Sequence, residues 1–480
     1  MTPFRIIFKS KIHFHRVILM LKEGKMTKRK MEMEIINHHA AGIDVGSRSH
    51  YVAVGQSLDD VKEFGVYAQD LEALCQWLLS YEITTVAMES TGDYWQNLYT
   101  ALIKHEINVV LCNGKFTKNA KGKKTDVKDC RWIQKLHALG LLTSSFLPDE
   151  TTEILRTYCR QRNNWLDLAA GSSRKMQKYL RFLNFRLDVV VKDICGLTGL
   201  KIIEDICKGN LDPDILAEHR HYNCRKSKEE IAKALNGNNR KDYLFGLKQE
   251  YESYKFYQGK IKECDKEIEK FVTAELKKTP EKLKLKTTEK SYKRINKNAP
   301  EIKDFNQMSY RYFGGIDLMA IEGVSHATIM SIMSEIGLEG FVKFKSSKEF
   351  CSWLRVAPNN KISGGKLLSN RIPKGSNRLK IALRRAANAI GNLKDTHLSD
   401  FFQRIAYRKG REAAVSATAR KLATIIWTMI TKKVQYNPPR EYLFLDQKRK
   451  LKAMQRIKKN IAKFGLKPED VGFNNLIMSC

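Results

Sequence analysis

The hydrophobic pattern between residues 35 and 149 alternates between two kinds of segment. Short runs rich in β-branched residues (GIDVG, SHYVAVG, ITTVAME and INVVLCN) predict strands, whereas LEALCQWLLSYE and NLYTALIKHE have the apolar spacing of helices. Gly46 and Ser47 separate the first two strands, which predicts a hairpin. The later strand, helix, strand order predicts parallel pairing with crossovers. We therefore expect an α/β domain with a mixed sheet.

The pattern becomes helical after residue 149. Apolar and aromatic residues recur every three to four positions among dense charges from 150 to 276, for example in LKQEYESYKFYQGKIKECDKEIEKFVTAEL. This spacing predicts long antiparallel helices or a coiled coil, a surface that would also assemble a homodimer or tetramer. The predicted fold class is thus an α/β N-terminal domain, a long helical or coiled-coil region and a mainly α C-terminal domain.

Composition sets the remaining segments apart. Residues 277–307 are rich in Lys and contain two prolines, which predicts a flexible linker or insertion. Residues 308–433 have mostly helical spacing and are expected to form the C-terminal domain, and residues 434–480 form a basic helical tail. Residues 1–34 precede the first strand and are expected to be a poorly ordered extension.

The charge balance narrows the range of partners. The 86 Lys and Arg against 52 Asp and Glu give a net charge of +34, which predicts a polyanion partner, with nucleic acid as the first candidate. A ribosome-associated or membrane-surface protein is the alternative. No stretch is long and apolar enough to span a membrane. The ten cysteines form no C-x-x-C pair, so reduced thiols in a cytoplasm are expected rather than a zinc knuckle or disulfides.

Four carboxylates stand out in this basic chain. Asp44 lies in or at the end of an apolar strand and Glu89 ends another, while Asp126 and Asp129 open a predicted helix three residues apart. Carboxylates gathered at one site would repel one another unless a cation lay between them, and Mg²⁺ or Mn²⁺ prefers such oxygen ligands. The alternative for Asp126 is a helix-dipole partner next to the N-cap Thr125. Lysines precede the helix and are expected to contact nucleic acid: Lys115, Lys118, Lys121, Lys123 and Lys124.

The C-terminal domain carries the second candidate site. Eight Lys and Arg and no acid occur between Lys361 and Arg385, interrupted by glycines and a proline, which predicts a flexible basic loop before a basic helix. Ser363 precedes two glycines and from composition alone is a turn residue. The cations expected to contact phosphate are Lys366, Arg371, Lys374 and Arg378.

The start of this domain, GGIDLMAIEGVSHATIMSIMSEIG, predicts two helices joined by the tight turn EGVS. It resembles a helix-hairpin-helix, whose turn amides contact phosphate, although Ser325 replaces the usual second glycine. A simple helical hairpin that packs on its neighbour is the alternative.

Three stretches, GIDVG, MESTGDYW and KTDVKDCRWIQKLHALGLL, carry a family resemblance. The N-terminal domain resembles the ribonuclease H-like fold of RuvC resolvases and, more closely, the DEDD domain of insertion-sequence-110 transposases. This resemblance implies a recombinase that cleaves and rejoins donor and target DNA and is guided by a structured noncoding RNA. The implied catalytic and metal-binding set is Asp44, Glu89, Asp126 and Asp129.

The resemblance extends through the basic block to YRKGREAAVSATARKLATIIW and covers most of residues 40 to 433. In the family's C-terminal domain a serine beside a Gly-rich turn is the nucleophile, which by position implies Ser363, with Ser369 and Ser376 as alternatives. A serine hydroxyl needs activation. The carboxylates of the first domain would supply it if the two domains meet, within one chain or between protomers. A bacterial or archaeal, nucleoid-associated location follows from the same resemblance.

Two other functions are consistent with the residues. A metal-dependent junction-resolving endonuclease would use the same carboxylates without Ser363, and a non-enzymatic nucleic-acid-binding protein would use neither. The chain has no G-x-x-x-x-G-K-[ST] loop for ATP, no H-E-x-x-H for zinc and no G-x-G-x-x-G for a dinucleotide. Strand exchange would therefore have to conserve the energy of the phosphodiester bond itself.

Overall fold

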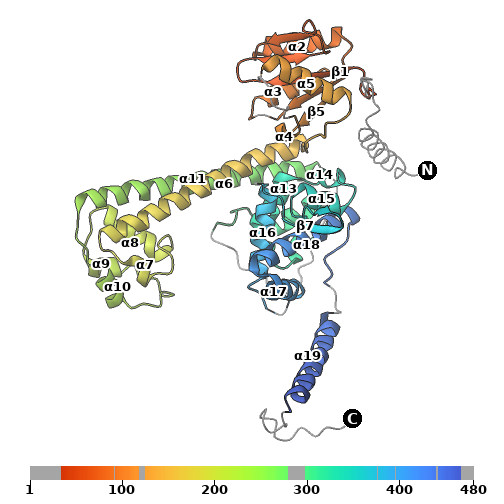
Figure 1. Ribbon diagram of the computed structural model, residues 1–480. Helices are drawn as coiled ribbons and strands as arrows, with labels where there is room; N and C mark the ends of the chain where they lie inside the picture. The colour runs from red at the N-terminus through yellow and green to blue at the C-terminus, as the bar shows by residue number, and fades with distance from the viewer. Residues whose placement is uncertain are drawn as a thin grey trace. The chain divides into compact units, whose positions relative to one another are not determined.

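A computed structural model describes residues 34–90, 92–117, 125–278, 298–375, 377–394, 396–438 and 442–465 (Figure 1). The chain divides into two compact units between Leu147 and Pro148. Almost all of the predicted N-terminal extension and most of the Lys-rich segment 277–307 lie outside the described residues.

The first unit is built on a five-stranded mixed sheet. Its strands are β1 (Ala40–Val45), β2 (His50–Ala53), β3 (Val61–Phe64), β4 (Thr85–Glu89) and β5 (Asn108–Cys112). Their order is β3-β2-β1-β4-β5, antiparallel from β3 to β1 and parallel from β1 to β5, which is the arrangement of a ribonuclease H-like domain. The predicted hairpin and the predicted parallel pairing are thus confirmed. β3 was not predicted, because its sequence of four residues, VKEF, is too short and too polar to give a strand pattern.

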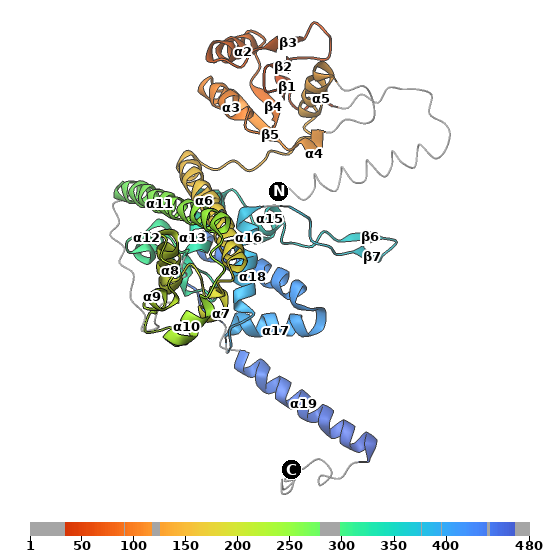
Figure 2. The same ribbon diagram turned by 90° about the vertical axis from the view of Figure 1, so that its left-hand side faces the viewer.

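Helices cover both faces of this sheet. They are α2 (Ala68–Ser80), α3 (Trp95–Lys104), the short α4 (Gly114–Thr117) and α5 (Asp126–Ala138). Alternate residues of β1 and β4, such as Ile43 and Met88, form one core with Leu74 of α2 and Leu98 of α3. The residues between them face α5, which lies on the other side of the sheet (Figure 2).

The second unit begins with two long antiparallel helices, α6 (Glu150–Phe182) and α11 (Lys241–Lys277). Tyr158 contacts Phe271 near one end, and Lys175 pairs with Glu250 at 2.9 Å further along, so the two helices run in opposite directions. This confirms the predicted antiparallel helices. Four shorter helices connect them and share their apolar core: α7 (Leu187–Val190), α8 (Leu197–Cys207), α9 (Pro213–Ala217) and α10 (Lys228–Ala234).

The rest of the second unit is mainly helical, as predicted, and α18 packs against α15, α16 and α17. Its helices are α12 (Phe305–Tyr312), the 3-10 helix η1 (Leu318–Ala320), α13 (His326–Glu335), α14 (Glu339–Val342), α15 (Ser347–Trp353), α16 (Arg378–Ile390), α17 (His397–Lys409), α18 (Arg411–Lys432) and α19 (Tyr442–Phe464). None of the described helices is long and apolar enough to cross a membrane.

Two details differ from the sequence-based expectations. The segment expected to form a helix before the EGVS turn contains only the three-residue η1, so the predicted pair of helices is incomplete. Ser325 caps α13 instead, because its hydroxyl accepts a hydrogen bond from the Thr328 amide at 3.4 Å. The predicted basic loop contains a β-hairpin of β6 (Lys361–Ser363) and β7 (Lys366–Ser369).

Candidate active site and nucleic-acid interface

Asp44 and Glu89 lie side by side at one edge of the sheet. The parallel register pairs Ile43 of β1 with Met88 of β4, so the two acidic residues stand one position further along neighbouring strands. Adjacent strands are about 4.8 Å apart. Both residues lie on the face of the sheet towards α5, because residues an even number of positions apart on a strand share a face. Thr85, four residues before Glu89, hydrogen-bonds through Oγ1 with Nε2 of His137 in α5 at 2.9 Å, and Gly42, two residues before Asp44, contacts α5. Both side chains are half-buried.

The contact between α5 and β1 fixes where the start of α5 lies. Gln134 donates from Nε2 to the Ala40 carbonyl at 3.1 Å, and a Cβ on Gly42 would lie 2.1 Å from the Gln134 amide and 2.6 Å from the Cys130 carbonyl. The two elements therefore run in opposite directions in close contact. Asp44 lies two residues beyond Gly42, which is about 7 Å further along β1. One turn of α5, from Cys130 back towards Asp126, covers a similar distance of about 5.4 Å. Asp44 is thus directed towards the first turn of α5, which begins at Asp126.

Two electrostatic effects agree with this placement. Burial raises the pKa of the Cys130 thiol to about 12, and the negative charge of Asp44 adds to the rise. A hydrogen bond with Glu63 raises the pKa of Tyr51, and the charge of Asp126 contributes. Tyr51 is the cross-strand partner of Asp44. Asp44 and Asp126 therefore act on side chains in one small region.

Thr117 and Gly114 of α4 hold the Glu89 carboxylate. The Thr117 hydroxyl donates to Oε2 of Glu89 at 2.8 Å, and Thr117 is itself 6% exposed. A Cβ on Gly114 would lie 2.1 Å from Oε1 of Glu89, so glycine leaves the space that this carboxylate fills. Thr117 has no signal in the sequence, because only the path of α4 across the end of β4 brings it to Glu89.

The start of α5 supports both interpretations of its acidic residues. Thr125 is the N-cap and accepts a hydrogen bond from the Lys128 amide at 3.4 Å, so Asp126 and Asp129 lie in the first turn, where helix-dipole stabilisation applies. Asp126 is exposed and Asp129 is half-buried. Of the lysines expected nearby, Lys115 lies in α4, and the rest lie outside the described residues: Lys118, Lys121, Lys123 and Lys124.

The donor set at this edge fits a hard divalent cation. Among the described residues no three His, Cys, Asp or Glu side chains stand close enough together to enclose a metal ion. Mg²⁺ does not require such an enclosure, because it keeps several waters and usually takes one or two protein carboxylates together with phosphate oxygens of the substrate. Asp44 and Glu89 on neighbouring strands, with Asp126 near the edge, are of the type and accessibility that this coordination needs.

Ser363 is the last residue of β6, and the β6–β7 hairpin protrudes from the helices of its unit (Figure 2). Gly364 and Gly365 form its two-residue turn with φ of +53° and +74°, as the type I′ hairpin turn requires. Ser363 pairs across the hairpin with Lys366, and both are exposed. No Asp, Glu or His occurs in the sequence between Glu349 and Asp395. This segment therefore provides no carboxylate or imidazole next to Ser363.

The strand that returns from the hairpin is tied down at its base. Arg355 donates from Nη1 to the Lys374 carbonyl at 3.0 Å, and Lys380 donates from Nζ to the Pro373 carbonyl at 2.9 Å. Burial lowers the pKa of the Lys380 ammonium group, with Arg384 and Arg355 adding to the effect. These bonds leave exposed the four cations expected to contact phosphate, which are Lys366, Arg371, Lys374 and Arg378.

The alternative serines differ from Ser363 in their surroundings. The Ser369 hydroxyl accepts a hydrogen bond from the Arg371 amide at 3.3 Å, which is the role of a turn residue. Ser376 lies outside the described residues.

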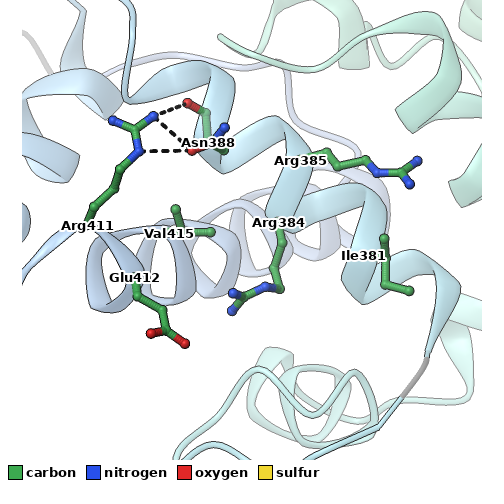
Figure 3. A pocket seen from close by; sticks show the side chains of 7 residues that line it. All are labelled: Ile381, Arg384, Arg385, Asn388, Arg411, Glu412 and Val415. Carbon is green, nitrogen blue, oxygen red and sulfur yellow. Dashed lines mark hydrogen bonds between the residues drawn. The ribbon is translucent and has the colours of Figure 1, made fainter. Parts of the chain in front are cut away.

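An open pocket of about 570 Å³ lies between α16 and α18 (Figure 3). Arg411 donates from Nη2 to the side-chain oxygens of Asn388 at 2.8 Å and Asn392 at 3.0 Å, and Arg384 donates from Nη1 to Ser416 Oγ at 2.6 Å. These bonds join α16 and α18, with one arginine donor from each helix. Arg385 is exposed at the same pocket, so the pocket extends the basic surface beyond Arg378.

The sheet order and the acidic edge define the first unit as a ribonuclease H-like domain, joined to a mainly helical unit with a basic, serine-bearing hairpin. A family model described as a transposase, of the DEDD type of insertion sequence IS110, matches residues 41–185. A second model, described as the transposase IS116/IS110/IS902 family, matches residues 317–403. The chain belongs to the IS110 family of transposases.

A curated relative agrees with this assignment. The chain is similar to a probable family 20 transposase of Pseudomonas aeruginosa, strain PAO1, with 25% identity over 126 residues. The match covers 25% of this chain and 36% of the relative, so it spans about a third of that protein. The first family match contains all four carboxylates, and the second contains Ser363 with its neighbouring cations.

Proposed function

We propose that this protein cleaves and rejoins DNA strands through a covalent link between Ser363 and a DNA phosphate. The observation that carries the proposal is the hairpin, which presents the Ser363 hydroxyl to solvent opposite Lys366 in a segment without any acid. A phosphate that reaches this hydroxyl meets only positive charge. The two family matches support the same assignment.

The chemistry consists of two balanced transfers. Oγ of Ser363 attacks the phosphorus of a phosphodiester, the Oγ–P bond forms, and the bond from phosphorus to one deoxyribose oxygen breaks. The serine proton is lost and the departing oxygen leaves as a hydroxyl group. A deoxyribose hydroxyl from another strand then attacks the phosphoserine, which forms the new phosphodiester and returns Ser363 to its free state. No energy cofactor is required, because each step exchanges one phosphate ester for another.

Asp44, Glu89, Asp126 and Asp129 would hold Mg²⁺ or Mn²⁺. Such an ion neutralises phosphate charge and makes phosphorus more open to attack. The parallel pairing of β1 and β4 fixes the positions of Asp44 and Glu89 on neighbouring strands. The Thr117 hydroxyl orients Glu89. The DEDD family match favours use of a divalent metal.

The remaining partners are proposed from charge, architecture and the family resemblance. The net charge of +34 favours polyanions, of which donor and target DNA are proposed. A structured noncoding RNA that guides their choice is proposed from the resemblance to insertion-sequence-110 transposases alone. Lys366, Arg371, Lys374 and Arg378 would contact their phosphates. The long helices α6 and α11 are the surface proposed to form a dimer or tetramer.

Replacing the nucleophile tests the proposal. The substrates are labelled DNA from the ends of the element that carries this gene and RNA transcribed from its flanking noncoding region. Ser363→Ala is expected to abolish the covalent protein–DNA adduct on denaturing gels and to abolish strand exchange, because it removes the oxygen that is proposed to bond to phosphorus.

Ser369→Ala is the matched control and is expected to leave the adduct intact, because its hydroxyl supports a turn. Full DNA cleavage by Ser363→Ala would instead favour the junction-resolving endonuclease, in which the carboxylates alone support hydrolysis. Failure of the wild-type protein to cleave any of these substrates would favour a non-enzymatic nucleic-acid-binding protein.

A further inference from the structure

The β6–β7 hairpin has two chemically different faces. Its register pairs Ser363 with Lys366, and Ile362 with Leu367. Directly opposed residues share a face and successive pairs alternate between faces. One face is therefore polar and carries the proposed nucleophile. The other face is apolar, and a bulge adds Leu368 near it.

The apolar face is exposed along its whole length. Ile362 is 64% exposed, Leu367 56% and Leu368 67%, and a Cβ on either turn glycine would meet nothing within 4 Å. A two-stranded hairpin is only marginally stable in water without a covered apolar face. The hydrogen bonds at residues 355–380 hold its base but leave its length unsupported. This combination is typical of a surface that is completed by a partner.

Charge selects the kind of partner. Eight cations and no acid lie between Lys361 and Arg385, so a polyanion is strongly favoured next to this hairpin. A nucleic acid also has apolar surface, but only on its bases, which become accessible when a duplex is locally opened. Aliphatic side chains act as wedges between base steps in several DNA-bending proteins, and a two-stranded ribbon is narrow enough to enter a groove.

We propose that the apolar face of the hairpin, Ile362 and Leu367 with Leu368, packs against bases that are unstacked or unpaired beside the phosphate bound on the Ser363 face. The hairpin would then lie between the phosphate and the bases: the phosphate contacts its polar face and the bases contact its apolar face. This proposal rests on the proposed function, because it concerns the same hairpin. It adds a base-contacting surface to a site otherwise built from phosphate contacts.

A fluorescent base analogue measures the effect directly. 2-Aminopurine is placed at successive positions beside the cleavage point in the DNA, and in a second series in the RNA, because its fluorescence rises when it unstacks. The wild-type protein is expected to raise the fluorescence at one or two adjacent positions. The rise is expected in the DNA series, because the phosphate bound at Ser363 belongs to DNA, and a rise in the RNA series alone would overturn the proposal.

The double variant Ile362→Thr, Leu367→Thr places β-branched side chains, which favour strands, at both positions but removes the apolar contact. It is expected to lose most of the fluorescence rise and to reduce cleavage on the order of tenfold or more, because unstacking a base step costs a few kcal/mol that the wedge offsets. The matched control, Ile362→Val with Leu367→Ile, keeps the apolar face and is expected to behave like the wild type. Circular dichroism confirms that both variants fold.

The outcomes separate this proposal from the proposed function. Ser363→Ala is expected to keep the fluorescence rise while losing the adduct, and an adduct that persists would contradict the nucleophile whatever the fluorescence shows. An unchanged fluorescence rise in the Thr double variant would overturn the wedge. A change in sedimentation of the free protein in that variant would overturn it too, because the apolar face would then be covered by a second copy of the chain.

Discussion

At the scale of single residues, the Glu89 carboxylate accepts a hydrogen bond from a hydroxyl that is distant in sequence. Thr117 lies 28 residues away and donates to Glu89 from a buried position, at the point where α4 crosses the end of β4. A hydrogen bond to a charged group contributes about 1.5–3 kcal/mol. If Glu89 holds the metal as proposed, the loss of this bond should be visible in the metal dependence of cleavage.

Thr117→Val keeps the shape of the side chain and removes the hydroxyl. We expect it to raise the Mg²⁺ concentration needed for half-maximal cleavage and to slow cleavage by roughly ten- to hundredfold, the factor equivalent to that energy. Thr117→Ser restores the donor and is expected to restore both quantities. Equal behaviour of the Val and Ser variants, measured by metal titration of cleavage, would show that Thr117 has only a packing role.

At the scale of elements, the two long helices are fixed in register by a buried ion pair. Arg162 of α6 donates from Nε to Asp265 of α11 at 2.5 Å, and the two side chains are 3% and 1% exposed. Asp265 also accepts from the Glu301 amide at 3.1 Å, and Arg162 donates to the Asn298 carbonyl at 3.2 Å. The pair therefore anchors the start of the C-terminal part of this unit to both helices.

Asp265→Ala is expected to destabilise the second unit by about 3–5 kcal/mol, because it leaves the Arg162 guanidinium buried without its counter-charge. Urea unfolding followed by circular dichroism measures the change. The exposed pair Lys175–Glu250 provides the comparison, and Glu250→Gln should cost less than about 1 kcal/mol. A small loss of stability in Asp265→Ala would indicate that water reaches the guanidinium group.

The β6–β7 hairpin shows how local signals can be misinterpreted at this scale. The sequence SGGK contains a good two-residue turn, but its glycines together with the flanking cations predict a flexible loop. Strands of three and four residues with no buried position give no alternating pattern to detect. The pairing across the turn, rather than any burial, defines these strands.

At the scale of the whole molecule, the candidate nucleophile and the candidate metal ligands lie in different compact units. No Asp, Glu or His occurs in the sequence around Ser363, from residue 350 to residue 394, whereas the four candidate metal ligands all lie before residue 148. If Ser363 is the nucleophile and the four carboxylates hold the metal, as proposed, strand transfer requires residues of both units.

Asp44→Asn tests the composite site, because it changes a residue of the first unit while the adduct forms on the second. We expect the rate of Ser363 adduct formation to fall on the order of a hundredfold or more, while nucleic-acid binding measured by gel shift remains. Adduct formation at the wild-type rate would show that the units act independently. Mixing Asp44→Asn with Ser363→Ala then decides the arrangement: recovered strand exchange places the site between protomers, and no recovery places it within one chain.

Much of this architecture was predictable from the sequence because its signals are local. The strand and helix periods, the Gly46-Ser47 turn and the capping Thr125 each depend on a few neighbouring residues, and they predicted the mixed sheet, the antiparallel helices and the acidic residues at strand and helix ends. The family motifs added the roles implied for Asp44, Glu89, Asp126, Asp129 and Ser363.

Only the tertiary structure decided which of these groups meet. The parallel register places Asp44 beside Glu89, the close approach of α5 at Gly42 places the first turn of α5 near the same edge, and α4 brings Thr117 to Glu89. The two faces of the serine hairpin likewise follow from its register. Pairing between distant segments depends on how their surfaces pack, and no short window of sequence contains that information.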